Sequence, residues 1–306
     1  MIKSKFGKQN TAEEVTQESD LNGKNVLITG VNSGLGQETM RVLESRGAHI
    51  IGTARTMDKA SAAADANGGN ITPLACELSD FDSVKQCANA VRALDIPIDV
   101  LICNAGIMAL PKLELANGFE QQFNTNHLGH FILVHNLLQQ VKQADQGRIV
   151  MLSSLAHKMA PAAGINFDNL DGSNGYNGWK FYGQSKLANL LTAVALSKLL
   201  EGSKATANAI HPGVIKTNLS RNMTGIQGLI MNNPVSSLLV KLAMGGKTIE
   251  QGAATQCYVA TAPELAGISG KYFSDNNEER PSRLAQNEAL ASNLWDYSCE
   301  VLADYI

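Results

Sequence analysis

The chain has 306 residues, of which 44% are hydrophobic and 17% are charged, and its net charge is −3. A chain of this length and composition can bury a large core as one domain or two. The charges form no long basic run, which excludes a nucleic-acid or anionic-membrane surface as the main partner.

Residues 1–20 are polar, and we expect them to form an N-terminal extension ahead of a single domain over 21–306. Thr11 and Glu14 have the spacing of a capping box, which predicts a short helix. The extension lacks the apolar stretch of a signal peptide, and no segment reaches the roughly 18–20 apolar residues of a membrane span. Five scattered cysteines without a C-x-x-C pair are typical of a reducing compartment. We therefore expect a soluble cytoplasmic protein with no membrane anchor.

Strands and helices alternate along the rest of the chain. The predicted strands are 24–30, 49–54, 71–76, 100–103, 148–152, 205–210 and 271–273. The predicted helices are 34–47, an alanine-rich one before 67, one over about 80–94, and 118–144, 179–201, 248–261 and 282–303. This order predicts an α/β fold, a doubly wound parallel sheet of about seven strands (Rossmann-type) with helices on both faces.

The segment 25–36 runs from a buried strand through a glycine-rich turn into a helix. Such a turn suits a phosphate group, because glycines let the backbone approach an anion and the helix begins with free N–H groups. Gly30, Gly34 and Gly36 follow Thr29 with the spacing G-x-x-x-G-x-G, which differs from the common dinucleotide fingerprint G-x-G-x-x-G. This spacing resembles that of the short-chain dehydrogenase/reductase family.

Four later motifs follow in the order of the same family. They are Cys103-Asn-Ala-Gly106, Asn126-His-Leu-Gly-His130, Tyr182-Gly-Gln-Ser-Lys186 and His211-Pro-Gly-Val-Ile-Lys-Thr217. The resemblance covers residues 20–303, and the stretches 126–131, 186–189 and 270–274 are similar to the retinol-dehydrogenase-like branch. Many members of that branch carry a membrane anchor, which we do not expect here. We therefore do not carry retinoids over as the substrate.

Tyr182 and Lys186 lie at positions i and i+4 of a predicted helix, which places their side chains about 5–6 Å apart on one face. A cation beside a phenol favours the phenolate, and lowering the pKa of about 10 by about 3 units requires roughly 4 kcal/mol. Lys186 and an oxidised nicotinamide, both positive, are the expected sources. The resemblance implies that Tyr182 is the general acid/base. It also implies that Ser154, with Ser153 as the alternative, binds the substrate oxygen, and that Asn126 holds a water in the proton relay with Lys186.

The resemblance further implies a cofactor site at the carboxyl ends of the strands. Its expected residues are Gly30, Asn32, Ser33, Gly34, Leu35, Gly36, Arg55, Glu77, Leu78, Asn104, Ala105, Gly106, Tyr182, Lys186, Pro212, Gly213, Val214 and Thr217. Glu77 stands where the family usually has Asp, and Cys103 where it has Asn. Arg55 follows the second strand, where an NAD-binding chain has an acid, and a guanidinium there would bind the 2′-phosphate of NADP. We expect NADP(H) rather than NAD(H), the alternative being that Arg55 only ends a strand at the surface.

Residues 213–247 are rich in apolar side chains and are expected to cover an apolar aldehyde, ketone or alcohol as a mobile substrate lid. The alternative is an amphipathic helix packed on the sheet. His127 and His130 have a spacing that suits a metal pair, but no third ligand is evident. We therefore expect packing or polar contacts from them and no metal site.

Two functions compete. The first is an NADP-dependent oxidoreductase, and the second is a catalytically silent NADP-binding protein that senses redox state. Silent members of the family commonly lose one of the four active-site residues, and here Asn126, Ser154, Tyr182 and Lys186 are all present. The enzyme is therefore favoured. Relatives often pair through the two long helices, so 118–144 and 179–201 are the expected faces of a homodimer or tetramer.

Overall fold

The computed structural model describes residues 1–215 and 246–306, so that most of the predicted lid and Thr217 lie outside the described residues. The core of the fold is one eight-stranded sheet with the order β10-β9-β8-β7-β4-β1-β2-β3. Its strands are β1 (Asn25–Thr29), β2 (His49–Ala54), β3 (Ile71–Ala75), β4 (Val100–Cys103), β7 (Arg148–Leu152), β8 (Thr206–His211), β9 (Tyr272–Ser274) and β10 (Asn277–Glu278). All neighbouring strands of this sheet are parallel except β9 and β10, which are antiparallel. The prediction of a doubly wound parallel sheet is confirmed.

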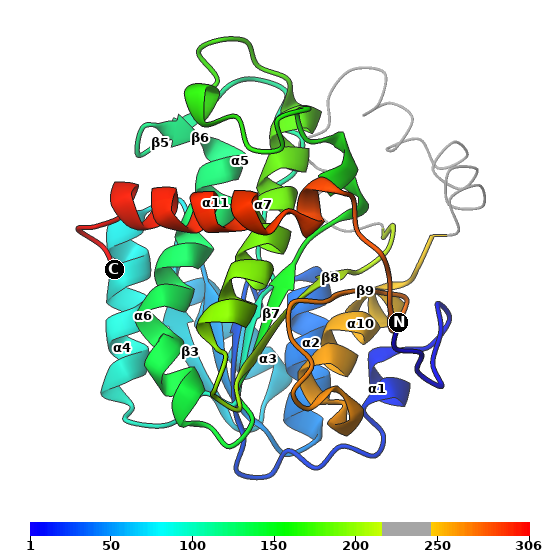
Figure 1. Cartoon of the computed structure of the whole chain (residues 1–306). Helices are drawn as coiled ribbons and strands as arrows, with labels where there is room; N and C mark the ends of the chain where they lie inside the picture. Colours follow the sequence, from blue (N-terminus) through cyan, green and yellow to red (C-terminus); the bar gives the residue numbers. More distant parts are fainter. Residues whose placement is uncertain (216–245) are drawn as a thin grey trace, which may run out of the picture.

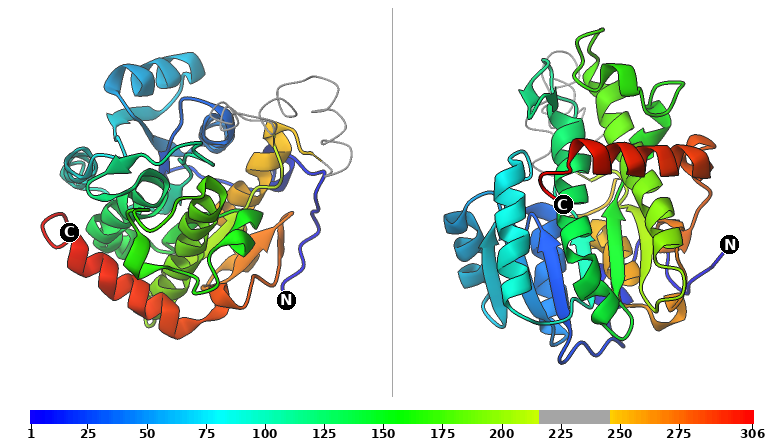
Figure 2. Two further views of the ribbon diagram at one scale, coloured as in Figure 1. Left: turned by 90° about the horizontal axis from the view of Figure 1, so that it is seen from above. Right: turned by 60° about the vertical axis from the view of Figure 1, so that its left-hand side comes forward.

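Helices cover both faces of the sheet (Figure 1 and Figure 2). One face carries α4 (Phe81–Ala93), α6 (Gly129–Gln143) and α7 (Gly178–Leu199). The other carries α2 (Gly34–Ser45), α3 (Met57–Asn67) and α10 (Ile249–Thr261). Each face therefore has its own hydrophobic core, as expected of a parallel sheet.

Strand β1 shows how the sequence builds this arrangement. Val26, Leu27 and Ile28 are fully buried. Successive side chains of a strand point to opposite faces, and accordingly Leu27 lies in the core under α6 and α7 while Val26 and Ile28 lie in the core under α2 and α10. A continuous apolar run, rather than an alternating one, is what a strand covered on both faces requires.

The predicted helix 118–144 is wrong at its N-terminal end. The chain first forms a hairpin of β5 (Leu115–Ala116) and β6 (Phe119–Glu120), then the short helix α5 (Gln121–Phe123) and a π-helical turn over Asn124–Leu128, and only then α6. Asn117 and Gly118 both have positive φ angles, of 52° and 82°, as a tight hairpin turn requires. The carboxylate of Glu120 then accepts hydrogen bonds from the backbone N–H groups of Gln122 and Phe123, which starts α5.

The N-terminal segment packs on the domain. The predicted capping box is confirmed in α1 (Ala12–Val15), because Thr11 and Glu14 each bond the other's backbone N–H. Both ends of α1 are buried against α10, and the Phe6 ring lies 6.1 Å from the ring of Tyr258. Residues 1–20 are thus held by side-chain contacts with the C-terminal part of the domain.

The C-terminal helix α11 (Glu288–Val301) lies across α7 and α6 (Figure 1). The ring centroid of Trp295 lies 4.6 Å from that of Phe131 in α6, and Ser298 bonds the ring nitrogen Nε2 of His127 at 3.1 Å. The two long helices on which a second chain was expected to pack are therefore covered by this chain's own C-terminus. Within the described residues, no helix combines the length and the apolar character needed to cross a membrane.

Candidate active site

The glycine-rich turn joins β1 to α2 at the carboxyl edge of the sheet. Gly30 and Gly34 have positive φ angles of 76° and 59°, which favour glycine. A Cβ at Gly36 would collide with the carbonyl oxygen of Gly30 and come 2.6 Å from Nδ2 of Asn104. Ser33, the N-cap residue, makes no side-chain hydrogen bond to the helix, and the first turn of α2 contains no acid. The turn is thus a close-packed backbone cradle with N–H groups open to an anion.

The turn after β4 packs directly against this cradle. Asn104 donates through Nδ2 to the carbonyl of Thr29 at 2.8 Å. The hydroxyl of Thr29 accepts from the backbone N–H groups of Asn104 at 2.9 Å and Ala105 at 3.0 Å. The structure therefore brings two of the sequence motifs together through Thr29, a residue that the motif spacing alone does not single out as a hydrogen-bonding centre.

Arg55 and Glu77 follow the next two strands at the same edge. Arg55 comes directly after β2 and is exposed. Glu77 is half-buried, and its Oε1 accepts hydrogen bonds from the backbone N–H and the hydroxyl of Ser79, at 3.2 and 2.8 Å. One oxygen of the Glu77 carboxylate is thus used in local bonds to Ser79, whereas the Arg55 side chain faces solvent.

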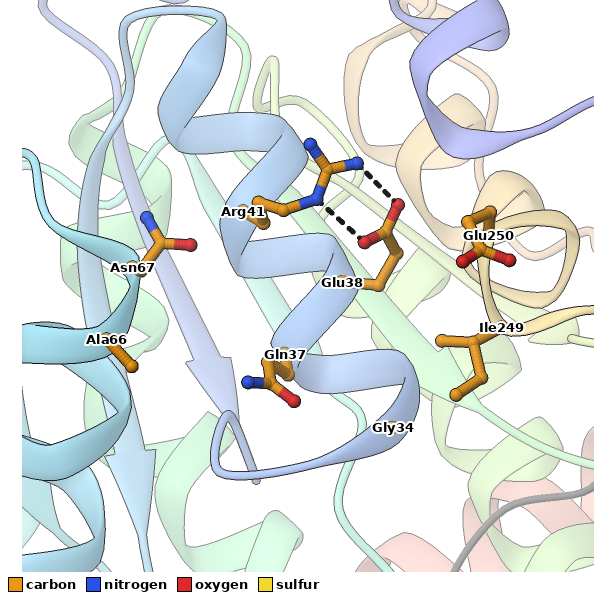
Figure 3. Close-up of a pocket in the computed structure, with 8 residues that line it drawn as sticks. All are labelled: Gly34, Gln37, Glu38, Arg41, Ala66, Asn67, Ile249 and Glu250. Atoms are coloured by element: carbon orange, nitrogen blue, oxygen red, sulfur yellow. Dashed lines mark hydrogen bonds and ion pairs between the residues drawn. The ribbon is translucent and has the colours of Figure 1, made fainter.

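A pocket of about 330 Å³ opens beside the start of α2, and Figure 3 shows the residues that line it. Of the predicted cofactor residues, its lining includes only Gly34. Its cation, Arg41, is held by Glu38 through Nε at 2.9 Å and Nη2 at 2.8 Å and also pairs with Glu13 at 2.8 Å. These carboxylates raise the pKa of Arg41 above its usual range. Arg41 is therefore already neutralised, and Arg55 is the better candidate for a phosphate at this end.

Tyr182 and Lys186 lie on the first turns of α7 and are both buried. The Nζ of Lys186 lies 5.8 Å from the centroid of the Tyr182 ring and donates to the carbonyl of Leu152 at 3.1 Å. Burial raises the pKa of Tyr182 to about 12, partly offset by a side-chain hydrogen bond with Ser154. Burial also lowers the pKa of Lys186 to about 8. From the chain's own residues, the pKa of Tyr182 thus shifts in the direction opposite to the one expected from the sequence, because loss of solvent outweighs the hydrogen bond with Ser154.

The two serines after β7 have different surroundings. The hydroxyl of Ser153 is buried and donates to the carbonyl of Lys186 at 2.7 Å, which ties β7 to α7. Ser154 is partly exposed, caps the following turn by accepting from Ala156 N–H at 3.2 Å, and bonds Tyr182. Of the two serines, Ser154 is therefore the one whose hydroxyl meets the Tyr182 phenol.

Asn126 lies in the middle of the π-helical turn and is fully buried. Its Oδ1 accepts from the backbone N–H of Ile107 at 2.8 Å, and its Nδ2 donates to the carbonyl of Ile107 at 2.9 Å and to Ser185 Oγ at 3.0 Å. A Cβ at Gly106 would lie 2.9 Å from Oδ1 of Asn126 and 3.4 Å from Nζ of Lys186. The side chain of Asn126 is thus used to join the loop after β4 to α7, with Gly106 between them.

Three of the expected cofactor residues, Pro212, Gly213 and Val214, follow directly after β8. Gly213 has a φ of 100°, and a Cβ there would lie 2.7 Å from the Lys247 side chain. The backbone N–H of Lys247 donates to the carbonyl of Val214 at 2.9 Å, and its buried Nζ lies 2.7 Å from Asp275. Lys247 therefore packs against Gly213 and bonds Val214, a role that the sequence did not reveal because Lys247 lies 33 positions beyond Val214.

The expectation of no metal site concerned His127 and His130. Neither residue belongs to a group that could hold a metal, since residues 1–215 and 246–306 contain no cluster of three or more His, Cys, Asp or Glu side chains suited to one. His127 instead bonds Ser298 of α11. His130 bonds the main-chain carbonyl of Asn126 and the hydroxyl of Thr29.

Known proteins match this chain over nearly its whole length. Residues 24–167 match a family model described as short chain dehydrogenase. The chain is 42% identical to the short-chain dehydrogenase TIC 32 B, chloroplastic, of Brassica napus, over 98% of this chain and 95% of that protein. It is 39% identical to retinol dehydrogenase 13 of Homo sapiens, over 92% of this chain and 85% of that protein. A crystal structure of an uncharacterised protein from Mycobacterium Paratuberculosis has a TM-score of 0.74 and 32% identity, over 96% of this chain and 97% of that one.

This chain therefore belongs to the short-chain dehydrogenase/reductase family, in its retinol-dehydrogenase-like branch. The family consists of oxidoreductases that use NAD(P), and the backbone cradle at Gly30 and Gly36 fits the pyrophosphate of such a cofactor.

Proposed function

We propose that this protein is an NADP-dependent oxidoreductase that transfers hydride between the nicotinamide and an apolar aldehyde, ketone or alcohol. The observation that carries the proposal is that the side chains of Tyr182, Ser154 and Lys186 lie close together. The buried phenol of Tyr182 bonds Ser154, and Lys186 lies on the same helical face one turn away. All of them adjoin the carboxyl edge of the sheet, where ligands of doubly wound folds bind.

In the reductive direction, Ser154 holds the carbonyl oxygen of the substrate and Tyr182 donates its proton to that oxygen. A pKa of about 12 keeps the phenol protonated at neutral pH, which is the form that a proton donor needs. Lys186 is mostly charged below its pKa of about 8 and returns the proton through a water that Asn126 holds. When bound, the nicotinamide supplies or accepts the hydride.

The cofactor residues divide by charge. The N–H groups at the start of α2 suit the pyrophosphate of a dinucleotide. The small residues Ala105 and Gly106 suit its uncharged parts. Arg55, exposed after β2, suits a 2′-phosphate, because a guanidinium forms a forked, charge-assisted pair with phosphate oxygens. This supports NADP(H) over NAD(H) as the cofactor.

The cytoplasm is the location that we propose, because the cysteines are free and four of the five are buried. The Brassica relative is named as chloroplastic. Fractionation of the native cell decides between the two, and enrichment of the protein in an organelle would contradict the cytoplasmic proposal.

The decisive experiment measures NADPH oxidation by the purified protein with a broad panel of apolar aldehydes and ketones. We expect turnover with part of the panel, and loss of at least about 10²-fold in kcat for Tyr182→Phe with an NADPH Kd near that of the wild type. Tyr297→Phe, which removes a phenol from α11 outside the site, is the matched control and should keep full activity. Tight NADPH binding without turnover across the panel would instead favour the silent redox sensor.

A further inference from the structure

His130 is a fully buried residue in the first turn of α6 that bonds two parts of the candidate site. Its Nδ1 lies 2.9 Å from the main-chain carbonyl oxygen of Asn126. Its Nε2 lies 2.9 Å from the hydroxyl oxygen of Thr29, at the end of β1. The imidazole thus spans the distance between the π-helical turn and the strand that leads into the cofactor cradle.

The chemistry of the partners fixes which nitrogen carries the proton. Burial and the positive charge of Lys186 together outweigh the hydrogen bond to Asn126 and lower the pKa of His130 to about 4, so the ring is neutral and has one N–H. A carbonyl oxygen can only accept, so the N–H is on Nδ1 and donates to Asn126. Nε2 must then accept from the Thr29 hydroxyl, whose other acceptor, the carbonyl of Ile102, is farther away at 3.5 Å.

Every hydrogen-bonding position of the Thr29 hydroxyl is therefore used. Its proton is donated to His130, and its two lone pairs accept from the backbone N–H groups of Asn104 and Ala105. The result is one continuous chain of hydrogen bonds. It runs from the main-chain carbonyl of Asn126, the residue expected to hold the water of the proton relay, through His130 and Thr29 to the turn after β4.

We propose that His130 is a positioning residue that holds the Asn126 carbonyl in register with the cofactor cradle. His130 acts through Asn126 on one side and through Thr29 on the other. This proposal rests on the proposed function, since Asn126 matters to catalysis only in an enzyme. His127 gives the contrast. It is equally buried and lies three residues earlier, but its Nε2 bonds Ser298 of α11, away from both motifs.

Two substitutions separate the two bonds of His130, because each side-chain amide reproduces one ring nitrogen. His130→Asn places an N–H near the position of Nδ1 and keeps the bond to Asn126, whereas His130→Gln places an acceptor near Nε2 and keeps the bond to Thr29. We expect His130→Gln to lower kcat about tenfold with a nearly unchanged NADPH KM, and His130→Asn to raise the NADPH KM and Kd about tenfold with a nearly unchanged kcat.

The control pair is His127→Asn and His127→Gln. Both are expected to lower the midpoint of urea unfolding while kcat and the NADPH KM stay within about twofold of the wild type. The proposal fails if the two His130 variants change kcat and KM in the same way as each other, or if they behave like the His127 pair. If the protein shows no turnover at all, the proposed function is wrong. The NADPH Kd would then still distinguish His130→Asn from His130→Gln.

A readout that does not depend on activity is the tautomer of His130 in ¹⁵N-labelled protein. We expect its imidazole nitrogen signals to show Nδ1–H and an unprotonated Nε2, with no protonation down to about pH 5. A ring that carries its proton on Nε2 could not donate from Nδ1 to the Asn126 carbonyl, and a ring charged at pH 6 could not accept from the Thr29 hydroxyl, so either result would overturn the proposal.

Discussion

The buried surroundings of Lys186 disfavour the positive charge of its ammonium group. It is buried, and the carbonyl of Leu152 is the hydrogen-bond acceptor of its ammonium. A pKa that falls from 10.5 to about 8 means that the folded protein holds this proton less tightly than the unfolded chain does. The residue therefore costs stability, and its retention fits a functional role rather than a structural one.

Lys186→Met should stabilise the protein while abolishing turnover. At pH 7 the buried charge costs about 3 kcal/mol, since each pKa unit corresponds to about 1.36 kcal/mol. The Leu152 carbonyl keeps its other donor, Asn189, so the variant leaves no carbonyl unpaired. The unfolded chain binds more protons than the folded one between about pH 8 and 10.5, so the stability of the wild type rises with pH in that window and approaches that of the variant.

Urea unfolding at pH 7 and at pH 10 measures this difference. Lys198→Met is the control, because Lys198 is exposed and pairs with the exposed Glu288, and such a pair contributes little. If Lys186→Met were less stable than the wild type at pH 7, the ammonium would be a net stabilising group and the argument from burial would be wrong.

Arg55→Asp tests the cofactor preference. A carboxylate at the end of β2 would repel a 2′-phosphate and suit a free 2′-hydroxyl, so we expect the NADPH KM to rise by at least about tenfold and the NADH KM to fall or stay constant. Steady-state kinetics with both cofactors measure the ratio. An unchanged ratio would remove Arg55 from the site and leave it as a residue that ends a strand.

At the scale of elements, the unit formed by β1, the glycine-rich turn and α2 depends on close backbone contact. The turn leaves no space for a side chain at Gly36, where a Cβ would collide with the Gly30 carbonyl. The π-helical turn before α6 carries Asn126 at its centre and directs the buried side-chain amide of Asn126 toward the backbone of Ile107. π-turns of this kind are frequent at functional sites.

Gly36→Ala should therefore weaken NADPH binding about a hundredfold, because the Gly30 backbone has to move away and the cradle loses its geometry. Gly7→Ala is the matched control: a Cβ at Gly7 meets no heavy atom within 4 Å. Isothermal titration with NADPH measures both. Equal affinities for the two variants would show that the cofactor does not depend on this turn.

At the scale of the whole molecule, α11 decides which surfaces are free. It packs on α7, places Trp295 on Phe131 of α6, and bonds His127 in the π-helical turn through Ser298. The same helix reaches the C-terminal residues, where Tyr305 packs edge-on against Phe81 of α4 at 5.3 Å. A homodimer or tetramer that pairs through α6 and α7 would have to displace α11.

Trp295→Ala should loosen α11 and expose the apolar face of α6. We expect a loss of about 2–4 kcal/mol in the free energy of unfolding and self-association that grows with protein concentration, whereas the wild type does not pair through this face. Asp296→Ala, a change on the exposed side of α11, is the control. Sedimentation velocity measures the association, and a wild-type dimer in which α6 and α7 gain protection from hydrogen exchange would contradict the prediction.

The sequence by itself determined the seven parallel strands of the sheet, most helix bounds and the order of the motifs, but neither the β5–β6 hairpin nor β10. The strands β2, β4 and β7 have the predicted bounds, because each contains a short run of apolar residues that is buried on both faces of the sheet. The glycine spacing and the Tyr182–Lys186 pair are local as well, since a turn and a helical face fix the positions of residues four or fewer apart.

Only the tertiary structure decided what depends on contacts between distant segments. The bond between His130 and Thr29 joins residues 101 positions apart, and the support of Gly213 by Lys247 joins a second distant pair. The raised pKa of Tyr182 follows from burial by several elements at once. Such effects are set by packing and loss of solvent, which no spacing along the chain records.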